Sequence, residues 1–170
     1  MSQRGIPCLF MRGGTSRGPY FLKSDLPADV VLRDRTLLAA MGSPDSRQID
    51  GLGGAETLTS KVAIIDRSNR DNSDIDYLFA QVNIEKPIVD TNPSCGNMLA
   101  GVGPAAIECG LINAEDGETR VVIFNENTSS RIEAVIQTPN RRVRYDGASL
   151  SPPERVGRTW QAPRRVAKTR

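Results

Sequence analysis

The chain has 170 residues, a length that allows one well-buried core and predicts a single domain. It carries 22 lysines and arginines against 20 aspartates and glutamates, a net charge of +2. It contains no histidine, which excludes a Ser-His-Asp triad and leaves proton transfer to lysine, cysteine, tyrosine or a carboxylate.

The first predicted elements are two short strands at residues 6–11 (IPCLFM) and 19–23 (PYFLK). Between them, residues 12–18 (RGGTSRG) combine glycine amides, two hydroxyls and two guanidinium groups. This composition suits carboxylate or phosphate binding, although an ordinary tight turn is the simpler interpretation. No basic region followed by an apolar block precedes these strands, and no apolar run is long enough to span a membrane, so we expect a cytoplasmic protein.

A surface helix is predicted next, at residues 33–42 (RDRTLLAAMG), with Gly42 as its stop signal. A long glycine-rich loop follows over residues 43–59, and residues 60–66 (SKVAIID) form the next predicted strand. Lys61 opens this strand. A half-buried lysine beside apolar residues can serve as a base, but most lysines at strand starts are solvated, and the sequence alone favours that interpretation.

Residues 76–84 (DYLFAQVNI) predict a strand with one core-facing side, formed by Leu78, Ala80, Val82 and Ile84. Three further strand candidates lie at residues 119–127, 130–138 and 141–145. The chain is thus expected to hold seven short strands and two helices, mostly joined by turns. This arrangement favours an antiparallel α+β domain over a doubly wound parallel sheet.

The second predicted helix, at residues 96–110 (GNMLAGVGPAAIECG), lies in a stretch that carries no charge from Thr91 to Ile107. Its apolar residues surround the axis, which indicates a helix buried on every side, and its glycines and alanines would let a sheet approach closely. Pro104 removes a backbone donor and predicts a local kink. The expected architecture is a thin central helix enclosed by a curved, barrel-like antiparallel sheet.

Cys95 directly precedes this buried helix. The free amides and positive dipole end of a helix start favour a thiolate and attract carboxylates, and Gly96 would let a ligand approach the backbone. Cys95 as a small buried residue is the alternative, which is what we expect for Cys8 and Cys109. The position of Cys95 at the start of the helix favours a functional role for it. An odd number of cysteines without paired spacing predicts reduced thiols.

Residues 152–170 form a basic tail with five arginines and one lysine against a single glutamate. The rest of the chain has 16 basic and 19 acidic residues, a net charge of −3. The tail has no apolar periodicity and one aromatic residue, Trp160. We therefore predict a solvated, poorly ordered tail rather than a nucleic-acid arm, with neither nucleic acid nor membrane as a partner.

Four motifs in order, MRGGTSRG (11–18), LLAAMGSPDSRQIDGLGGAETLTSKVAII (37–65), DYLFAQV (76–82) and CGNMLAGVGP (95–104), together resemble the PrpF family of the diaminopimelate-epimerase-like fold. The resemblance covers residues 4 to about 147. It implies cofactor-independent proton transfer on a small tricarboxylate, in a site between two similar domains. The motifs look most like those of members acting on 4-oxalomesaconate in gallate and protocatechuate breakdown. Members that isomerise 2-methylaconitate in propionate metabolism share most of them and remain an alternative.

The resemblance also implies roles for particular residues. Lys61 matches the family's proposed base in the TSK motif, and Cys95 matches the active-site cysteine in the CGN motif. Lys61 would remove a proton from carbon, and Cys95 would protonate or orient the opposite end of the substrate. The candidates for holding carboxylates and the enolate oxygen are Thr15, Ser16, Arg17, Gly96, Asn97 and Met98.

Family members carry a second domain of similar size after the YDG motif, which stands here at residues 145–147. We therefore expect an N-terminal epimerase-like domain at residues 1–150, a Pro/Arg-rich tail at residues 151–170, and no second family domain. Activity would then require a separate chain or a homo-oligomer to cover the exposed interdomain face. A non-catalytic remnant that binds carboxylates or a partner chain is the alternative.

Overall fold

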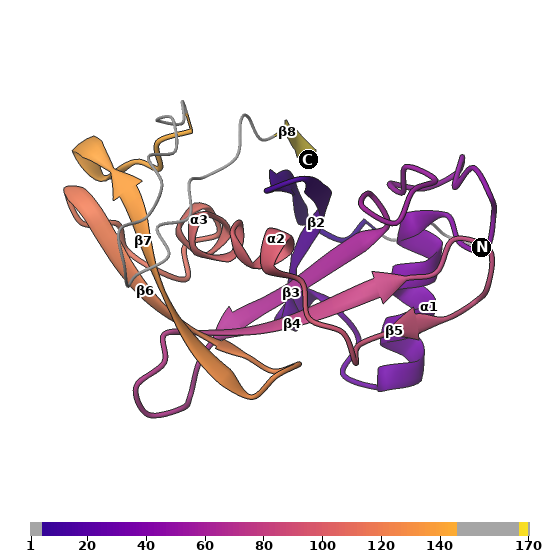
Figure 1. Ribbon diagram of the computed structural model, residues 1–170, viewed down its shortest axis with the longest axis horizontal. Helices are drawn as coiled ribbons and strands as arrows, with labels where there is room; N and C mark the ends of the chain where they lie inside the picture. The colour runs from indigo at the N-terminus through magenta and orange to yellow at the C-terminus, as the bar shows by residue number, and fades with distance from the viewer. Residues whose placement is uncertain (1–4, 146–166, 170) are drawn as a thin grey trace.

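The computed structural model describes residues 5–145 and 167–169 (Figure 1). Its strands are β1 (Cys8–Gly13), β2 (Ser16–Leu22), β3 (Lys61–Arg67), β4 (Ile75–Val82), β5 (Val89–Asp90), β6 (Gly117–Asn125), β7 (Ser130–Thr138) and β8 (Ala167–Thr169). Its helices are α1 (Val30–Met41), α2 (Gly96–Leu99) and α3 (Val102–Glu108), with 3-10 turns η1 (Lys23–Asp25) and η2 (Pro139–Arg141). One sheet has the order β7-β6-β4-β3-β2-β1-β8, and β5 pairs with β4.

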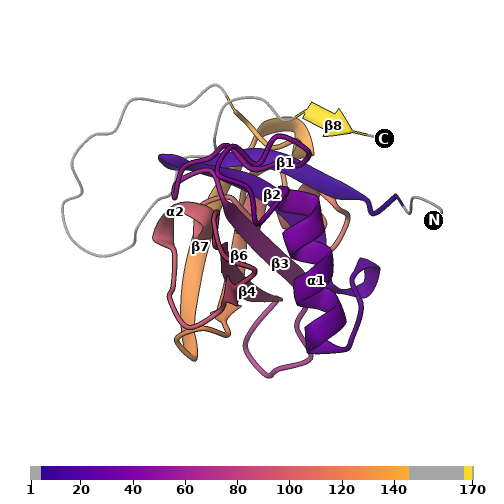
Figure 2. The same ribbon diagram turned by 90° about the vertical axis from the view of Figure 1, so that its right-hand side faces the viewer.

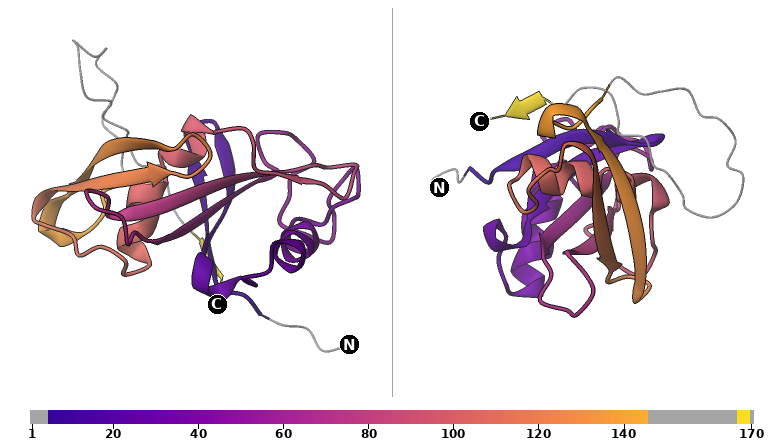
Figure 3. Two further views of the ribbon diagram at one scale, coloured as in Figure 1. Left: turned by 90° about the horizontal axis from the view of Figure 1, so that it is seen from below. Right: turned by 90° about the vertical axis from the view of Figure 1, so that its left-hand side faces the viewer.

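The sheet is covered on both faces. It curls around α2 and α3, and α1 packs on its other face (Figures 2 and 3). Strand β3 shows why: Ala63 and Ile65 pack in the core cluster with α2 and α3, whereas Val62 and Ile64 pack in a second cluster with α1. Because successive side chains of a strand alternate between faces, every residue from Lys61 to Ile65 is buried.

The expected α+β class and the enclosed central helix are confirmed, but the sheet is mixed rather than antiparallel throughout. Strands β2 and β3 are parallel, and so are β4 and β6. In each case a helical crossover joins the two strands, α1 in the first and α2–α3 in the second. A crossover returns the chain in the same direction, which a turn cannot do.

The glycine-rich segment at residues 12–18 is mostly strand. Strand β1 continues to Gly13 and β2 begins at Ser16, so the connection is a turn of Gly14 and Thr15 only. Gly14 has φ +53, which suits the tight turn of a two-residue hairpin. The strand predicted at residues 6–11 therefore lies two residues too early, and the strand predicted at residues 19–23 begins three residues too late.

Three other sequence predictions need correction. Strand β4 ends at Val82, and both its faces are buried, with Ala80 and Val82 toward α1 and Tyr77 and Phe79 toward α2–α3. Residues 141–145 form no strand: Arg141 is the last residue of η2, and positive φ values at Asn140 and Arg141 turn the chain.

The predicted buried helix is two short helices. The break lies at Ala100 and Gly101, one turn before Pro104, rather than at the proline itself. Pro104 has no N–H to donate to the carbonyl of Ala100, and its ring crowds that carbonyl, so the helix opens there. The break ends α2 after a single turn and orients it separately from α3.

The described residues include no helix long and apolar enough to cross a bilayer. Of the predicted tail, residues 151–166 and 170 lie outside the described residues, so their order stays a prediction. Residues 167–169 pair antiparallel with β1.

Candidate active site

Lys61 and Cys95, which the sequence separates by 34 positions, lie in direct contact. Lys61 Nζ donates a hydrogen bond to Cys95 Sγ over 3.5 Å. The two residues are only 8% and 7% exposed. An amine and a thiol are thus in hydrogen-bond contact in a site that is largely shielded from water.

The alternation of β3 directs Lys61 toward Cys95. Lys61 shares a strand face with Ala63 and Ile65, which pack against α2 and α3. Its Nζ lies 5.0 Å from the ring centroid of Phe79 on β4, and the face of an aromatic ring attracts positive charge. Gly18 on β2 lets this end of β3 approach closely, since a Cβ there would overlap the Lys61 carbonyl oxygen.

Cys95 is the N-cap residue of α2, with extended backbone (φ −131, ψ 103). The first intrahelical hydrogen bond runs from Leu99 N–H to the Cys95 carbonyl over 3.0 Å. The N–H groups of Gly96, Asn97 and Met98 come before that of Leu99 in the chain. They therefore belong to the first turn, where backbone N–H groups have no partner within the helix. The Cys95 side chain makes no capping hydrogen bond with them.

Two buried tyrosines hold α2 in place. The Tyr77 hydroxyl donates to the Cys95 carbonyl over 3.4 Å, and the Tyr20 hydroxyl donates to the Met98 carbonyl over 2.7 Å. Burial, followed by nearby negative charge that includes Cys95, raises the pKa of both tyrosines above the usual range. Both hydroxyls therefore keep their protons and act as donors.

These raised pKa values predict a loss of stability in alkali. In the unfolded chain each tyrosine returns to a pKa of about 10. The stability that the two contribute is complete below that value and is lost as pH rises toward their folded pKa values. For each tyrosine we expect the free energy of unfolding to fall by about 1.4 kcal/mol per pH unit above pH 10. Urea titrations across that range should show a shallower slope for Tyr77→Phe, and an unchanged slope would contradict the assignment.

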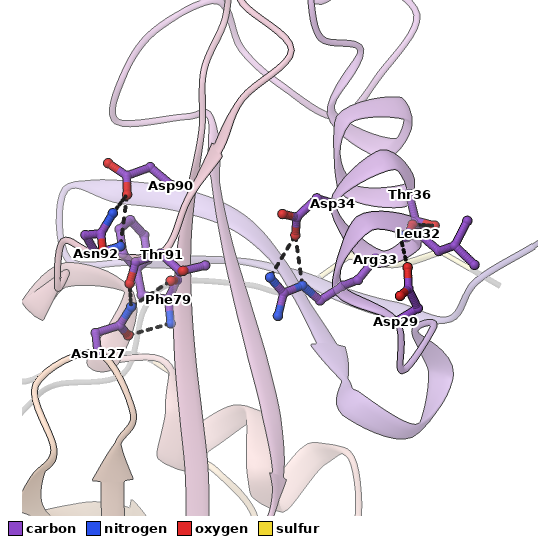
Figure 4. A network of polar contacts seen from close by, with 10 residues as sticks. All are labelled: Asp29, Leu32, Arg33, Asp34, Thr36, Phe79, Asp90, Thr91, Asn92 and Asn127. Carbon is purple, nitrogen blue, oxygen red and sulfur yellow. Dashed lines mark hydrogen bonds and ion pairs between the residues drawn. The ribbon is translucent and has the colours of Figure 1, made fainter.

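The segment that leads into Cys95 is fixed by Asn127 (Figure 4). Its Oδ1 accepts from the Phe79 amide over 2.8 Å, and its Nδ2 donates to the carbonyls of Phe79 and Thr91 over 2.9 and 2.6 Å. Asn127 therefore joins the strand that carries the ring beside Lys61 to the loop that ends at Cys95. Asn125 adds a bond from its Nδ2 to Ser94 Oγ over 2.9 Å.

Sequence reasoning missed both asparagines. They stand in the NEN stretch at the end of β6, and their partners are 31 to 48 positions away. Asparagine at a strand end usually indicates a turn, so only the pairing of β4 with β6 brings their amides to the Cys95 loop.

Replacing Asn127 with alanine should loosen this loop. The change removes three hydrogen bonds of a half-buried amide and is expected to cost about 1–3 kcal/mol of stability. Because Cys95 is shielded, freeing the preceding residues should also speed its alkylation by iodoacetamide several-fold. Peptide mass spectrometry measures that rate, with Cys109 as an internal reference. Asn92→Ala is the matched control, because the Asn92 side chain bonds only Asp90, the half-buried last residue of β5; equal effects of the two variants would contradict the role.

The hairpin tip meets the first turn of α2. Asn97 Nδ2 donates to Thr15 Oγ1 over 2.9 Å and to Ser16 Oγ over 3.4 Å. A Cβ at Gly13 would overlap the Asn97 carbonyl oxygen, so glycine is needed for this close approach. Five of the six predicted binding residues thus gather at one place: Thr15, Ser16, Gly96, Asn97 and Met98.

The side chain of Arg17 does not join them. It follows Ser16 in β2 and therefore lies on the opposite face of the sheet. Its guanidinium carbon is 6.0 Å from the ring centroid of Phe10, and its Nη2 approaches Gly54. Sequence patterns did not indicate the face of the Arg17 side chain, because the strand was expected to begin only after Arg17.

The other two cysteines lie in apolar surroundings but are less buried than predicted. Cys8 packs against the cluster under α1, and Cys109 packs against the cluster around α2 and α3. Both are half-buried, and none of the three cysteines, all within the described residues, forms a disulfide.

Comparison with known proteins places this geometry in context. A family described as "PrpF protein" matches residues 3–151. A 4-oxalomesaconate tautomerase from Pseudomonas putida is 59% identical over 147 residues, an alignment that covers 86% of this chain and 41% of that protein. The chain thus spans about two fifths of the length of this relative.

Two solved structures resemble the chain. The crystal structure of a methylitaconate-delta-isomerase has a TM-score of 0.82 and 47% identity, covering 86% of this chain and 65% of that one. A hydroxyproline epimerase from Agrobacterium vitis has a TM-score of 0.53 at 15% identity, covering 84% of this chain and 41% of that one. At that identity the likeness concerns the fold alone, and it confirms the epimerase-like fold class.

Proposed function

Because the chain belongs to the PrpF family, we propose that it is the N-terminal part of a tautomerase that moves a proton on 4-oxalomesaconate in the cytoplasmic breakdown of aromatic acids. The observation that supports this proposal most is the contact between Lys61 Nζ and Cys95 Sγ in a shielded site. The chemistry needs only a base and an acid, and this pair supplies both without a cofactor.

The reaction proceeds in two proton transfers with the substrate and a third that returns the proton from Lys61 to Cys95. Lys61 Nζ takes a proton from a carbon next to a carbonyl or across an allylic system, and Cys95 Sγ gives its proton to the other end of that system. The lysine then holds one extra proton and the cysteine lacks one. A transfer from Nζ to Sγ across their 3.5 Å contact restores both groups, so the proton count balances over one turnover.

The intermediate is a dienolate with several negative charges, and the gathered donors are positioned for it. The amides at the start of α2 and the hydroxyls of Thr15 and Ser16 offer uncharged hydrogen bonds to a carboxylate or to the enolate oxygen. One such donor can lower a barrier by about 3 kcal/mol. In this proposal the Arg17 guanidinium, on the other face, takes no part.

Two alternatives remain. One is 2-methylaconitate isomerisation, which needs the same base and acid on a similar tricarboxylate. The oxalomesaconate assignment is favoured because the tautomerase relative is 59% identical, against 41% for a 2-methyl-aconitate isomerase from Cupriavidus necator. The other is a non-catalytic module that binds carboxylates or a partner chain, since the chain spans only 41% of the tautomerase relative.

Ultraviolet absorbance with each substrate tests the proposal. The chain is assayed alone and joined to the remaining part of the Pseudomonas putida relative. We expect the joined protein to turn over 4-oxalomesaconate faster than 2-methylaconitate. Turnover of 2-methylaconitate alone would support the first alternative, and no turnover by either form would support the non-catalytic one.

A further inference from the structure

Two arginines face each other across the hairpin. Arg12 on β1 and Arg17 on β2 are direct cross-strand partners, one position from the closing pair Gly13 and Ser16. In an antiparallel pair of strands, hydrogen-bonded and non-hydrogen-bonded residue pairs alternate, so Arg12 and Arg17 form a pair without mutual backbone hydrogen bonds. The Arg17 amide instead donates to the Leu58 carbonyl over 3.0 Å. In such pairs the side chains come closest, with Cβ atoms about 4.5–5.5 Å apart.

This pair of like charges has no counter-charge among the described residues. Neither arginine takes part in an ion pair, and the one side-chain bond of Arg12 is a long contact, 3.5 Å, to the Thr15 carbonyl. Arg17 Nε is buried and has no hydrogen-bond partner. Like charges placed directly opposite destabilise a sheet, and an unsatisfied buried donor adds to that cost.

A glycine and a hydroxyl of the neighbouring loop lie close to the Arg17 guanidinium. Arg17 Nη2 lies against Gly54, where a Cβ would come within 2.8 Å of it and within 2.5 Å of Thr59 Oγ1. The Phe10 ring borders the same side. The one acidic residue in this stretch of loop, Glu56, is exposed and makes no ion pair with either arginine. The Arg17 guanidinium, a hydroxyl and a bare glycine thus lie together, with Arg12 at the facing position of β1 and no acidic partner for either arginine among the described residues.

We propose that Arg12 and Arg17 form a binding site for a small polycarboxylate, on the face of the sheet opposite Lys61 and Cys95. Each guanidinium fork matches one carboxylate in a bidentate manner, so two adjacent forks match two carboxylates of one ligand. The bound anion supplies the missing counter-charge. This site goes beyond the proposed reaction and does not depend on it.

Thermal unfolding of the full chain at matched, low ionic strength tests this site. Citrate should raise Tm by several degrees at saturating concentration, and acetate and inorganic phosphate should raise it less. Arg12→Gln and Arg17→Gln should each lose most of the citrate effect. Without citrate, each variant should unfold at the same or a higher temperature than the original chain, because the like-charge contact is gone.

Two controls separate this site from general charge effects and from the active site. Arg35→Gln removes an exposed arginine of α1 and should keep the full citrate effect. Lys61→Met should keep it as well. Equal citrate effects in all variants, a larger effect of phosphate, or a loss of the effect in Lys61→Met alone would each overturn the proposal.

Discussion

Replacing Lys61 with methionine, or Cys95 with serine, is expected to lower turnover of 4-oxalomesaconate by at least about 10³-fold in any active form of the protein. Methionine fills the space of the lysine stem beside Phe79 but cannot accept a proton. Serine keeps the size of the cysteine, but its hydroxyl is a far weaker acid than a thiol. Each change therefore removes one of the two proton transfers and leaves the packing intact.

The two residues should also act as one unit. If the proton returns from Nζ to Sγ after each turnover, losing either group stops the cycle, and the double variant should be scarcely slower than the worse single variant. Lys23→Met and Cys109→Ser are matched controls, because neither residue lies at the site, and both should keep nearly full activity. If the double variant lost turnover by the product of the two single losses, the proposed return of the proton from Nζ to Sγ would be contradicted.

A measurement without turnover supports the same test. The rate at which iodoacetamide alkylates Cys95 at a fixed pH, measured by peptide mass spectrometry, reports how the surroundings of the sulfur control its reactivity. Lys61→Met should change this rate, whereas Lys23→Met should not. An unchanged rate would mean that the 3.5 Å contact does not govern the thiol.

The sequence analysis chose two residues that lie in contact in the structure, but it did not predict how the strands pair. Cys95 could be chosen because an uncharged apolar segment follows it. The local pattern around Lys61 favoured a solvated lysine, and the family resemblance alone implied a role for it. Local patterns do not reveal which strands become neighbours, and the two parallel pairs arise because α1 and α2–α3 cross over the sheet.

The residues that position the site were harder to predict for the same reason. Asn127 acts through Phe79 and Thr91, and Tyr77 acts through the Cys95 carbonyl, across distances in sequence that no spacing rule covers. The side of the sheet on which the Arg17 side chain lies could be predicted only if Arg17 was known to belong to β2. A shift of one residue along a strand moves every side chain to the other side of the sheet.

The largest expected effect on stability is that of Gly18→Ala. Alanine is ordinarily better than glycine within a strand, by about 0.5–1 kcal/mol, so an open site would gain stability. Here a Cβ would overlap the Lys61 carbonyl oxygen and come within 3.3 Å of Met98 Cε. The methionine can rotate away, but the carbonyl belongs to the backbone beside the parallel β2–β3 pair and cannot. We therefore expect a loss of about 3 kcal/mol.

The strain also falls on the residue that carries the chemistry. Moving the Lys61 backbone away from β2 would change the contact of its amine with Cys95. Gly18→Ala should therefore alter the rate of Cys95 alkylation by iodoacetamide as well as the urea midpoint of unfolding. Gly5→Ala is the matched control, because a Cβ at Gly5 would meet nothing within 4 Å, and it should leave both measurements unchanged. If Gly18→Ala were as stable as Gly5→Ala, β2 and the start of β3 would lie farther apart than the structure places them, and the close approach that orients Lys61 would be absent.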